Sequence, residues 1–164
     1  MTELLLMRHA KSDRANWRGV DHERPLNERG VRSARAVGHH LADTGRQPDR
    51  VVSSTAVRAR TTAELVVDAA GWSVAVDLDD RLYGAGAMEL IGAVRETSVA
   101  VRRLLVVGHE PTWSMAASGL IGGVRLEMPT AAVAVVGFDV PWPQIEWDGG
   151  LLVEHVLARE LLVD

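Results

Sequence analysis

Short apolar runs alternate with amphipathic segments along most of this chain, and this alternation limits the folds open to it. A continuous apolar run of about four to eight residues is typical of a strand that is covered on both faces. The strand-like runs are residues 3–8, 50–54, 73–78 and 103–109. The helix-like segments are residues 27–45, 55–71 and 87–96, and one that begins at Pro111 or Thr112. Because strands joined through helices are parallel, the pattern predicts a three-layer α/β sandwich with a mostly parallel sheet.

The last third of the chain has a different pattern. Residues 131–140 and 151–163 are both rich in apolar residues, and a Pro- and Gly-containing segment, PWPQIEWDGG, lies between them. Two strand-like runs around a turn predict a hairpin. We therefore expect an antiparallel edge that closes the sheet late in the chain.

Composition supports one domain over residues 1–164. The 47% of hydrophobic residues is enough for a sizeable core, and no repeat or linker divides the chain. The absence of cysteine excludes disulfides and thiolate metal sites. A net charge of −4 argues against a general nucleic-acid binder, which normally has a basic surface.

The sequence also predicts a cytoplasmic protein. The apolar stretch in the opening MTELLLMRH is too short for a signal peptide. No apolar run approaches the roughly 20 residues that span a bilayer. We expect neither a membrane nor a nucleic acid as a partner, and the sequence specifies no oligomeric state.

Cationic and imidazole side chains follow three of the predicted parallel strands. Arg8 and His9 follow the first, Arg58 lies at the helix start after the second, and His109 follows the fourth. Ligands of open α/β sheets bind at the carboxyl ends of the strands, so these residues are expected to converge. Arginine forks and helix N-termini both favour phosphate oxygens. The residues therefore predict a site for a phosphoryl group.

Each of these residues also has an ordinary structural interpretation. A single histidine after a strand is often a solvated loop residue or a satisfied hydrogen-bond partner. Arg8 could pair with a carboxylate of the following loop. Arg58 and Arg60 could be surface residues that bridge to Glu64. Convergence of four such residues at one edge favours the functional interpretation.

Four stretches of this sequence resemble the histidine phosphatase superfamily, and in particular its SixA-like phosphohistidine phosphatases. The stretches are LLLMRHAKSD, DHERPLNERG, SSTAVRARTTAE and VVGHEPTW. The resemblance implies a phosphoglycerate-mutase-like fold with one histidine phosphatase domain. It also implies that His9 is the nucleophile, that Arg8 and Arg58 hold the phosphoryl oxygens, and that His109 completes the catalytic pocket.

The loop after the first strand supplies further candidates. Ser12 and Asp21 are expected to contribute to substrate binding. Larger members of the superfamily have a general-acid glutamate soon after the third strand, but this chain has Tyr83 near that place. The remaining candidates for the acid are Asp21, Glu23, Asp79, Asp80 and Glu89. An imidazole leaves more easily than an alkoxide, so a missing acid favours phosphohistidine as the substrate.

The resulting prediction is a metal-independent phosphatase that hydrolyses phosphohistidine in a protein through a phospho-His9 intermediate. It requires no metal and no cofactor, because arginines supply the positive charge. Its partner is a phosphorylated protein or a small phosphorylated substrate. The alternatives are a small-molecule phosphomonoesterase of the same superfamily and a phosphate-binding module without turnover.

Overall fold

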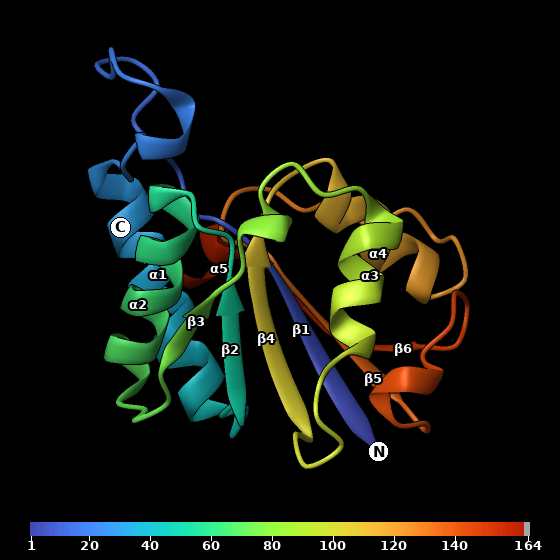
Figure 1. Cartoon of the computed structure of the whole chain (residues 1–164). Helices are drawn as coiled ribbons and strands as arrows, with labels where there is room; N and C mark the ends of the chain where they lie inside the picture. Colours follow the sequence, from blue (N-terminus) through green and yellow to red (C-terminus); the bar gives the residue numbers. More distant parts are fainter. Residues whose placement is uncertain (163–164) are drawn as a thin grey trace.

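A six-stranded sheet forms the centre of the computed structural model, which describes residues 1–162 (Figure 1). The strands are β1 (Thr2–Arg8), β2 (Arg50–Ser53), β3 (Val76–Leu78), β4 (Arg103–Gly108), β5 (Val133–Phe138) and β6 (Leu151–Val156). The α-helices are α1 (Glu28–Asp43), α2 (Val57–Ala70), α3 (Ala87–Arg95), α4 (Thr112–Leu120) and α5 (Ala158–Leu161). Short 3-10 helices lie at Asp21–Glu23, Asp80–Leu82 and Trp142–Gln144.

The strand order is β3-β2-β4-β1-β5-β6, with β1 near the centre. The pairs β1–β4, β2–β4 and β2–β3 are parallel. β5 is antiparallel to β1, and β6 is antiparallel to β5. The predicted fold class, a mostly parallel sheet with antiparallel strands late in the chain, is confirmed.

Helices cover both faces of the sheet, with α1, α2 and α5 on one side and α3 and α4 on the other (Figure 1). Because side chains alternate along a strand, β1 serves both cores. Its Leu4 and Leu6 lie in the core beneath α3 and α4. Its Leu5 and Met7 lie in the core beneath α1 and α2. All four side chains are fully buried, which explains why β1 is continuously apolar.

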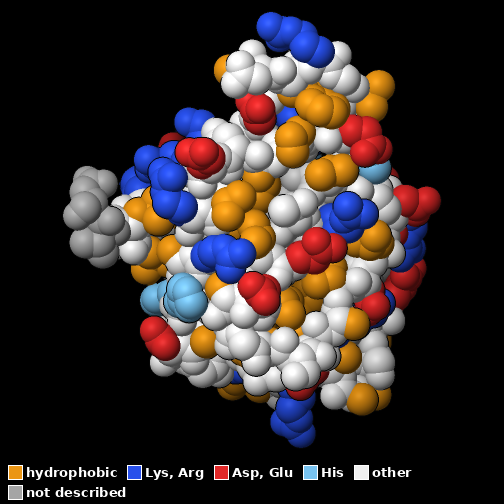
Figure 2. Space-filling view, turned by 90° about the vertical axis from the view of Figure 1, so that its left-hand side faces the viewer, with side chains coloured by type: hydrophobic (Ala, Val, Ile, Leu, Met, Phe, Trp, Pro, Cys, Tyr) orange, Lys and Arg blue, Asp and Glu red, His pale blue; other side chains and the backbone are white. Residues whose placement is uncertain are grey.

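The outer surface that α1 and α2 form has charges of both signs. In Figure 2, basic and acidic side chains are interspersed across this face rather than gathered into one area of a single sign. Two ion pairs contribute to this pattern, Arg35–Asp68 at 3.2 Å and Arg60–Glu64 at 3.6 Å. Within residues 1–162, no helix combines the length and the apolar character that crossing a membrane requires.

Local chemistry fixes α1 and the loop before it. The Asn27 side chain accepts a hydrogen bond from the Gly30 backbone N–H at 2.8 Å, which caps the helix. Gly30 lies against the Lys11 carbonyl so closely that a Cβ would clash with it. The Asn27 N–H also donates to that carbonyl at 3.0 Å. These contacts fold the DHERPLNERG stretch back onto the end of β1.

Two predicted strands are shorter in the structure. The run 73–78 forms a strand only over Val76–Leu78, which pairs with Val51–Ser53 of β2. The run 151–163 ends as a strand at Val156 and continues as α5, which packs on α1 with Leu161 against the core. Tertiary packing therefore overrides the strand pattern, and Val163 lies outside the described residues.

Candidate active site

The carboxyl ends of β1, β2 and β4 meet at one edge of the sheet and bring the predicted residues together. Arg8 ends β1 and His9 follows it, while Arg58 lies in the first turn of α2 and His109 follows β4. The ring centroids of His9 and His109 are 5.3 Å apart. The convergence predicted from the sequence is therefore found in the structure.

His9 is held as a neutral imidazole with a defined tautomer. Its side chain is buried, and its Nδ1 lies 2.7 Å from the Ala10 carbonyl oxygen. Since a carbonyl only accepts, Nδ1 carries the proton and Nε2 keeps its lone pair. Burial, together with the neighbouring His109, Arg58 and Arg8 and against the opposing effect of the Ala10 hydrogen bond, lowers the pKa of His9 to about 3. An unprotonated Nε2 is thus available at neutral pH.

Thr62 joins the segment that follows β1 to the helix that carries Arg58. Its Oγ1 accepts a hydrogen bond from the Ala10 N–H at 2.9 Å and donates one to the Arg58 carbonyl at 2.7 Å. The Thr62 side chain is fully buried, so water does not compete for these bonds. The residue therefore fixes the positions of His9 and Arg58 relative to each other. Sequence reasoning missed it, because a threonine within a helix gives no distinctive signal.

The two arginines have different anchors. The Arg8 Nη1 donates to the Met128 carbonyl at 3.1 Å. The Arg58 Nη1 and Nη2 donate to the backbone carbonyl and Oδ2 of Asp21 at 2.8 and 3.1 Å. Each Nε is buried, and no described residue accepts its hydrogen. Orphaned buried donors point to a missing acceptor, and the oxygens of an anion are suitable acceptors.

These contacts separate Arg58 from the neighbouring arginine on α2. Arg60, with its side chain 45% exposed, forms the surface pair with Glu64, whereas the Arg58 side chain is only 7% exposed. The surface interpretation therefore holds for Arg60 and fails for Arg58. Arg8 likewise bonds a backbone carbonyl rather than a carboxylate.

Ser54 and Trp113 lie beside His109 and hold its ring in place. Its Nε2 lies 2.8 Å from the Ser54 Oγ, and its Nδ1 is buried with no partner among the described residues. Burial lowers its pKa to about 4, with Arg58 as the next cause. The ring of Trp113 fills the space beside Gly108, where any Cβ would clash. His109 is therefore also a neutral, fixed imidazole.

Comparison with known proteins identifies the family. The model of the histidine phosphatase superfamily (branch 1) matches residues 4–100. The chain belongs to the histidine phosphatase superfamily. An uncharacterized protein of Mycobacterium tuberculosis is 38% identical over 165 residues, covering 93% of this chain and 100% of the relative.

Solved structures of SixA-type histidine phosphatases have the same fold. The structure from Agrobacterium tumefaciens that is assigned as the phosphohistidine phosphatase SixA has a TM-score of 0.81 at 26% identity, covering 95% of this chain and 97% of that one. The one from Nakamurella, also assigned as SixA, has a TM-score of 0.78 at 29% identity, covering 95% of each chain. Family membership and these neighbours support a phosphatase activity.

Asp21 and Tyr83 lie on the exposed side of the candidate site. The Tyr83 hydroxyl donates to the Asp21 Oδ2 at 2.6 Å, and Arg24 donates to the Oδ1 at 2.5 Å. The Tyr83 hydrogen bond, then Arg24 and Arg58, hold the pKa of Asp21 well below its usual range against the opposing effect of burial. The Tyr83 ring centroid lies 5.6 Å from that of His109. The tyrosine thus lies at the site, as its place in the sequence suggested.

Two carboxyl groups near the site, those of Asp21 and Asp79, have lowered pKa values. Asp21 is held ionised by its hydrogen-bond donors, as the preceding contacts require. Asp79 pairs with Arg81 at 2.8 Å, and this contact also lowers the pKa of Asp79. General acids need the opposite shift, toward higher pKa. These two acid candidates are therefore poorly suited to protonate an alkoxide.

Ser12, the other predicted substrate-binding residue, is joined to Asp21 through Arg24. Its side chain is buried, and its Oγ accepts a hydrogen bond from the Arg24 Nε at 2.9 Å. Ser12, His9 and Arg8 line a cavity of about 480 Å³. Over residues 1–162 there is no group of three or more His, Asp or Glu side chains arranged to hold a metal ion.

Burial of two neutral histidines predicts that the free energy of unfolding falls in mild acid. In the unfolded chain both bind a proton near pH 6.5, whereas in the native state His9 does so near 3 and His109 near 4. Their contribution is therefore present above pH 6.5 and is lost as the pH falls toward the native values. Between pH 7 and pH 5 the loss is about 2 kcal/mol for each histidine.

Urea unfolding at the two pH values measures this loss. A His9→Asn variant should lose about half of the pH dependence, since one of the two titrating groups is gone. His39→Asn is the matched control, because His39 is exposed on α1, and it should behave like the unchanged protein. Equal stability of the unchanged protein at pH 7 and pH 5 would contradict the assignment of two buried neutral imidazoles.

Proposed function

We propose that this histidine phosphatase hydrolyses phosphohistidine in a protein, without a metal, through a phospho-His9 intermediate. One observation carries the proposal: a buried, neutral His9 keeps the lone pair of its Nε2 while its Nδ1 is held by the Ala10 carbonyl. Arg8, Arg58 and His109 surround that imidazole. The proposal treats residues 1–164 as one histidine phosphatase domain.

The first step transfers the phosphoryl group to the enzyme. The Nε2 lone pair of His9 forms a bond to phosphorus while the P–N bond of the substrate breaks. The electron pair of that bond returns to the departing imidazole, which keeps the proton on its other ring nitrogen and leaves neutral. Arg8 and Arg58 balance the charge on the phosphoryl oxygens. Because these groups are already in place, little reorganisation is needed.

The second step releases phosphate. A water molecule attacks phospho-His9, the Nε2–P bond breaks, and the electron pair returns to Nε2. The protons of the water pass to phosphate and solvent, and His9 is again the neutral tautomer. His109, whose Nε2 lies beside Ser54, is the neighbouring group that contacts the phosphoryl oxygens. Arginines supply the positive charge in both steps, so the scheme uses no metal ion.

Two observations favour phosphohistidine over a phosphate ester. Asp21 and Asp79 have lowered pKa values, and an ester needs an acid for its leaving alkoxide whereas a phosphoramidate does not. In addition, two similar solved structures are assigned as phosphohistidine phosphatases. A small-molecule phosphomonoesterase would require another proton donor, for which Glu23, Asp80 and Glu89 are the other carboxyl candidates.

Rates on three substrates in the presence of EDTA test the proposal. A phosphohistidine peptide should react fastest, and an alkyl phosphate should react about 10² to 10⁴ times more slowly, which is the usual contribution of a general acid. An aryl phosphate with a good leaving group is the control, because its phenolate departs without protonation, and it should fall between the two. Faster hydrolysis of the alkyl phosphate would support the phosphomonoesterase instead. Binding of phosphate without turnover of any substrate would support the non-catalytic module.

A further inference from the structure

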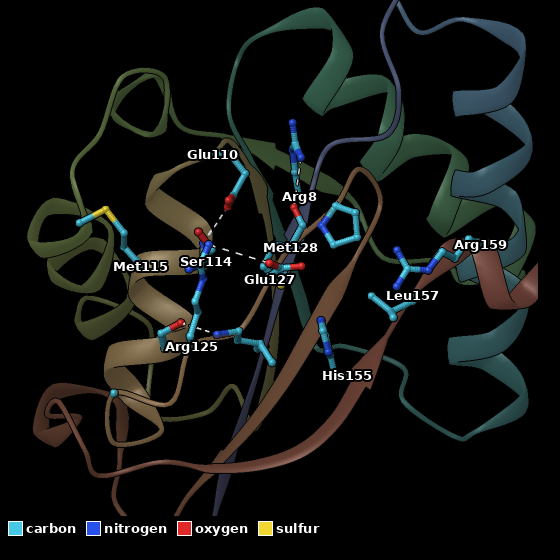
Figure 3. Close-up of a pocket in the computed structure, with 14 residues that line it drawn as sticks. Arg8, Glu110, Ser114, Met115, Arg125, Glu127, Met128, His155, Leu157 and Arg159 are labelled. Atoms are coloured by element: carbon cyan, nitrogen blue, oxygen red, sulfur yellow. Dashed lines mark hydrogen bonds and ion pairs between the residues drawn. The ribbon is translucent and has the colours of Figure 1, made fainter.

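A second and larger cavity adjoins the candidate site at Arg8. It has a volume of about 630 Å³ and lies between α4, the segment 121–129 and the end of β6 (Figure 3). We call it the α4–β6 cleft. The residues that define it are Arg8, Glu110, Met115, Arg125, His155 and Arg159.

The cleft adjoins the site, because Arg8 and Pro129 line both the α4–β6 cleft and the cavity beside His9. The Arg8 Nη1 donates to the carbonyl of Met128, which lies in the wall of the cleft. Glu110, at the same end, directly follows His109 in the chain. A molecule whose phosphoryl group sits at His9 therefore has this cleft directly beside it.

The lining combines apolar contact with exposed charge. Met115 is 60% exposed, and Leu126 and Leu157 add further apolar surface. The Arg125 side chain is 88% exposed, and Arg159 is also exposed. Methionine and arginine are enriched at protein–protein interfaces, where an apolar centre is bordered by a polar rim.

This lining fits a protein segment better than a metabolite. Small-molecule sites bury most of the ligand and place few, fixed polar groups around it. Here Arg125 and Arg159 are exposed at the border, and the Arg125–Glu127 contact is 3.9 Å long between side chains that are 88% and 80% exposed. Apart from Arg8, which the proposed function assigns to the phosphoryl group, the border of the cleft has two arginines, Arg125 and Arg159, and one glutamate, Glu127. The other glutamate, Glu110, accepts a hydrogen bond from the Ser114 backbone N–H at 2.7 Å. The charge at the border therefore favours an acidic occupant.

We propose that the α4–β6 cleft docks a segment of the phosphorylated protein next to its phosphohistidine. An apolar side chain of that segment contacts Met115, and an acidic side chain pairs with Arg125 or Arg159. This inference rests on the proposed function and adds the recognition of sequence around the phosphorylated residue. The reacting groups remain those around His9, and the cleft contributes to binding rather than to the chemical step.

Two synthetic phosphohistidine peptides test the docking. One carries leucine and glutamate beside the phosphohistidine, and the other carries leucine and lysine. The unchanged enzyme should have a KM about tenfold lower for the acidic peptide, with a similar kcat for both. A variant with Arg125→Glu and Arg159→Glu should reverse this preference. Free phosphohistidine, which does not reach the cleft, should be hydrolysed equally by both enzymes.

A control variant places two glutamates at the opposite edge of the sheet and changes the net charge by −3, against −4 in the cleft variant. Arg102 precedes β4 and Leu151 begins β6, and both are exposed. The variant Arg102→Glu/Leu151→Glu should keep the preference for the acidic peptide. An unchanged preference in the cleft variant would overturn the docking proposal, and so would an equal loss on free phosphohistidine. If the unchanged enzyme hydrolyses neither peptides nor free phosphohistidine, the proposed function itself fails.

Discussion

Replacement of His9 by asparagine should abolish turnover while leaving the fold intact. The side-chain amide can still donate to the Ala10 carbonyl, which the Nδ1 of His9 contacts at 2.7 Å, but it offers no nitrogen lone pair for attack. Loss of a nucleophile in covalent catalysis lowers kcat by about 10⁴ to 10⁶ in comparable enzymes. We expect a loss of this order on phosphohistidine substrates.

Rapid quenching with radiolabelled substrate measures the intermediate directly. The unchanged enzyme should carry acid-labile, alkali-stable label during turnover, as a phosphoramidate does, and the His9→Asn variant should carry none. His39→Asn, on the exposed side of α1, should retain both activity and label. Activity of His9→Asn within tenfold of the unchanged enzyme would show that another group attacks the phosphorus.

Replacement of Arg58 by alanine should lower kcat/KM by about 10² to 10³, the range for removal of one fixed transition-state donor. The reason is twofold, since the guanidinium is lost and the Asp21 carboxylate that it neutralises at 3.1 Å is left facing the phosphoryl oxygens. Steady-state kinetics on a phosphohistidine peptide measure the loss. Arg60→Ala is the matched control on the same helix, and it should change the rate by less than about twofold.

A double variant separates the two causes. Asp21→Asn removes the negative charge but keeps a group that can accept from Tyr83. If part of the loss comes from the uncovered carboxylate, Arg58→Ala/Asp21→Asn should be about tenfold more active than Arg58→Ala alone. No recovery would mean that Asp21 acts only by orienting Arg58. A loss in Arg60→Ala equal to that in Arg58→Ala would contradict the assignment of Arg58 to the site.

Much of the fold was predictable because its determinants are local. The apolar run of β1, the Asn27 cap of α1 and Gly45 after the end of α1 are local signals, each of which can be recognised from a few neighbouring residues. The parallel sheet followed from the alternation of these elements. Element ends were less predictable, since the strand pattern of residues 151–163 yields to packing of α5 on α1.

The residues of the candidate site were predictable for the same reason. Arg8, His9, Arg58 and His109 each lie at the carboxyl end of a strand or just after it, and parallel strands bring those ends together. Their catalytic roles remain proposals. The convergence itself follows from chain order and strand direction alone.

The charge states of the site residues and the identity of their hydrogen-bond partners could be established only from the tertiary structure. The neutrality of His9 depends on burial by segments distant in the chain, and Arg58 pairs with Asp21, 37 positions away, rather than with nearby Glu64. The hydrogen bond between Ala10 and Thr62 joins residues 52 positions apart, and the one between Tyr83 and Asp21 joins residues 62 positions apart. Local sequence specifies strands, helices and the order in which they meet. Desolvation and hydrogen bonding depend on which distant groups exclude water from an atom, and only the folded chain decides that.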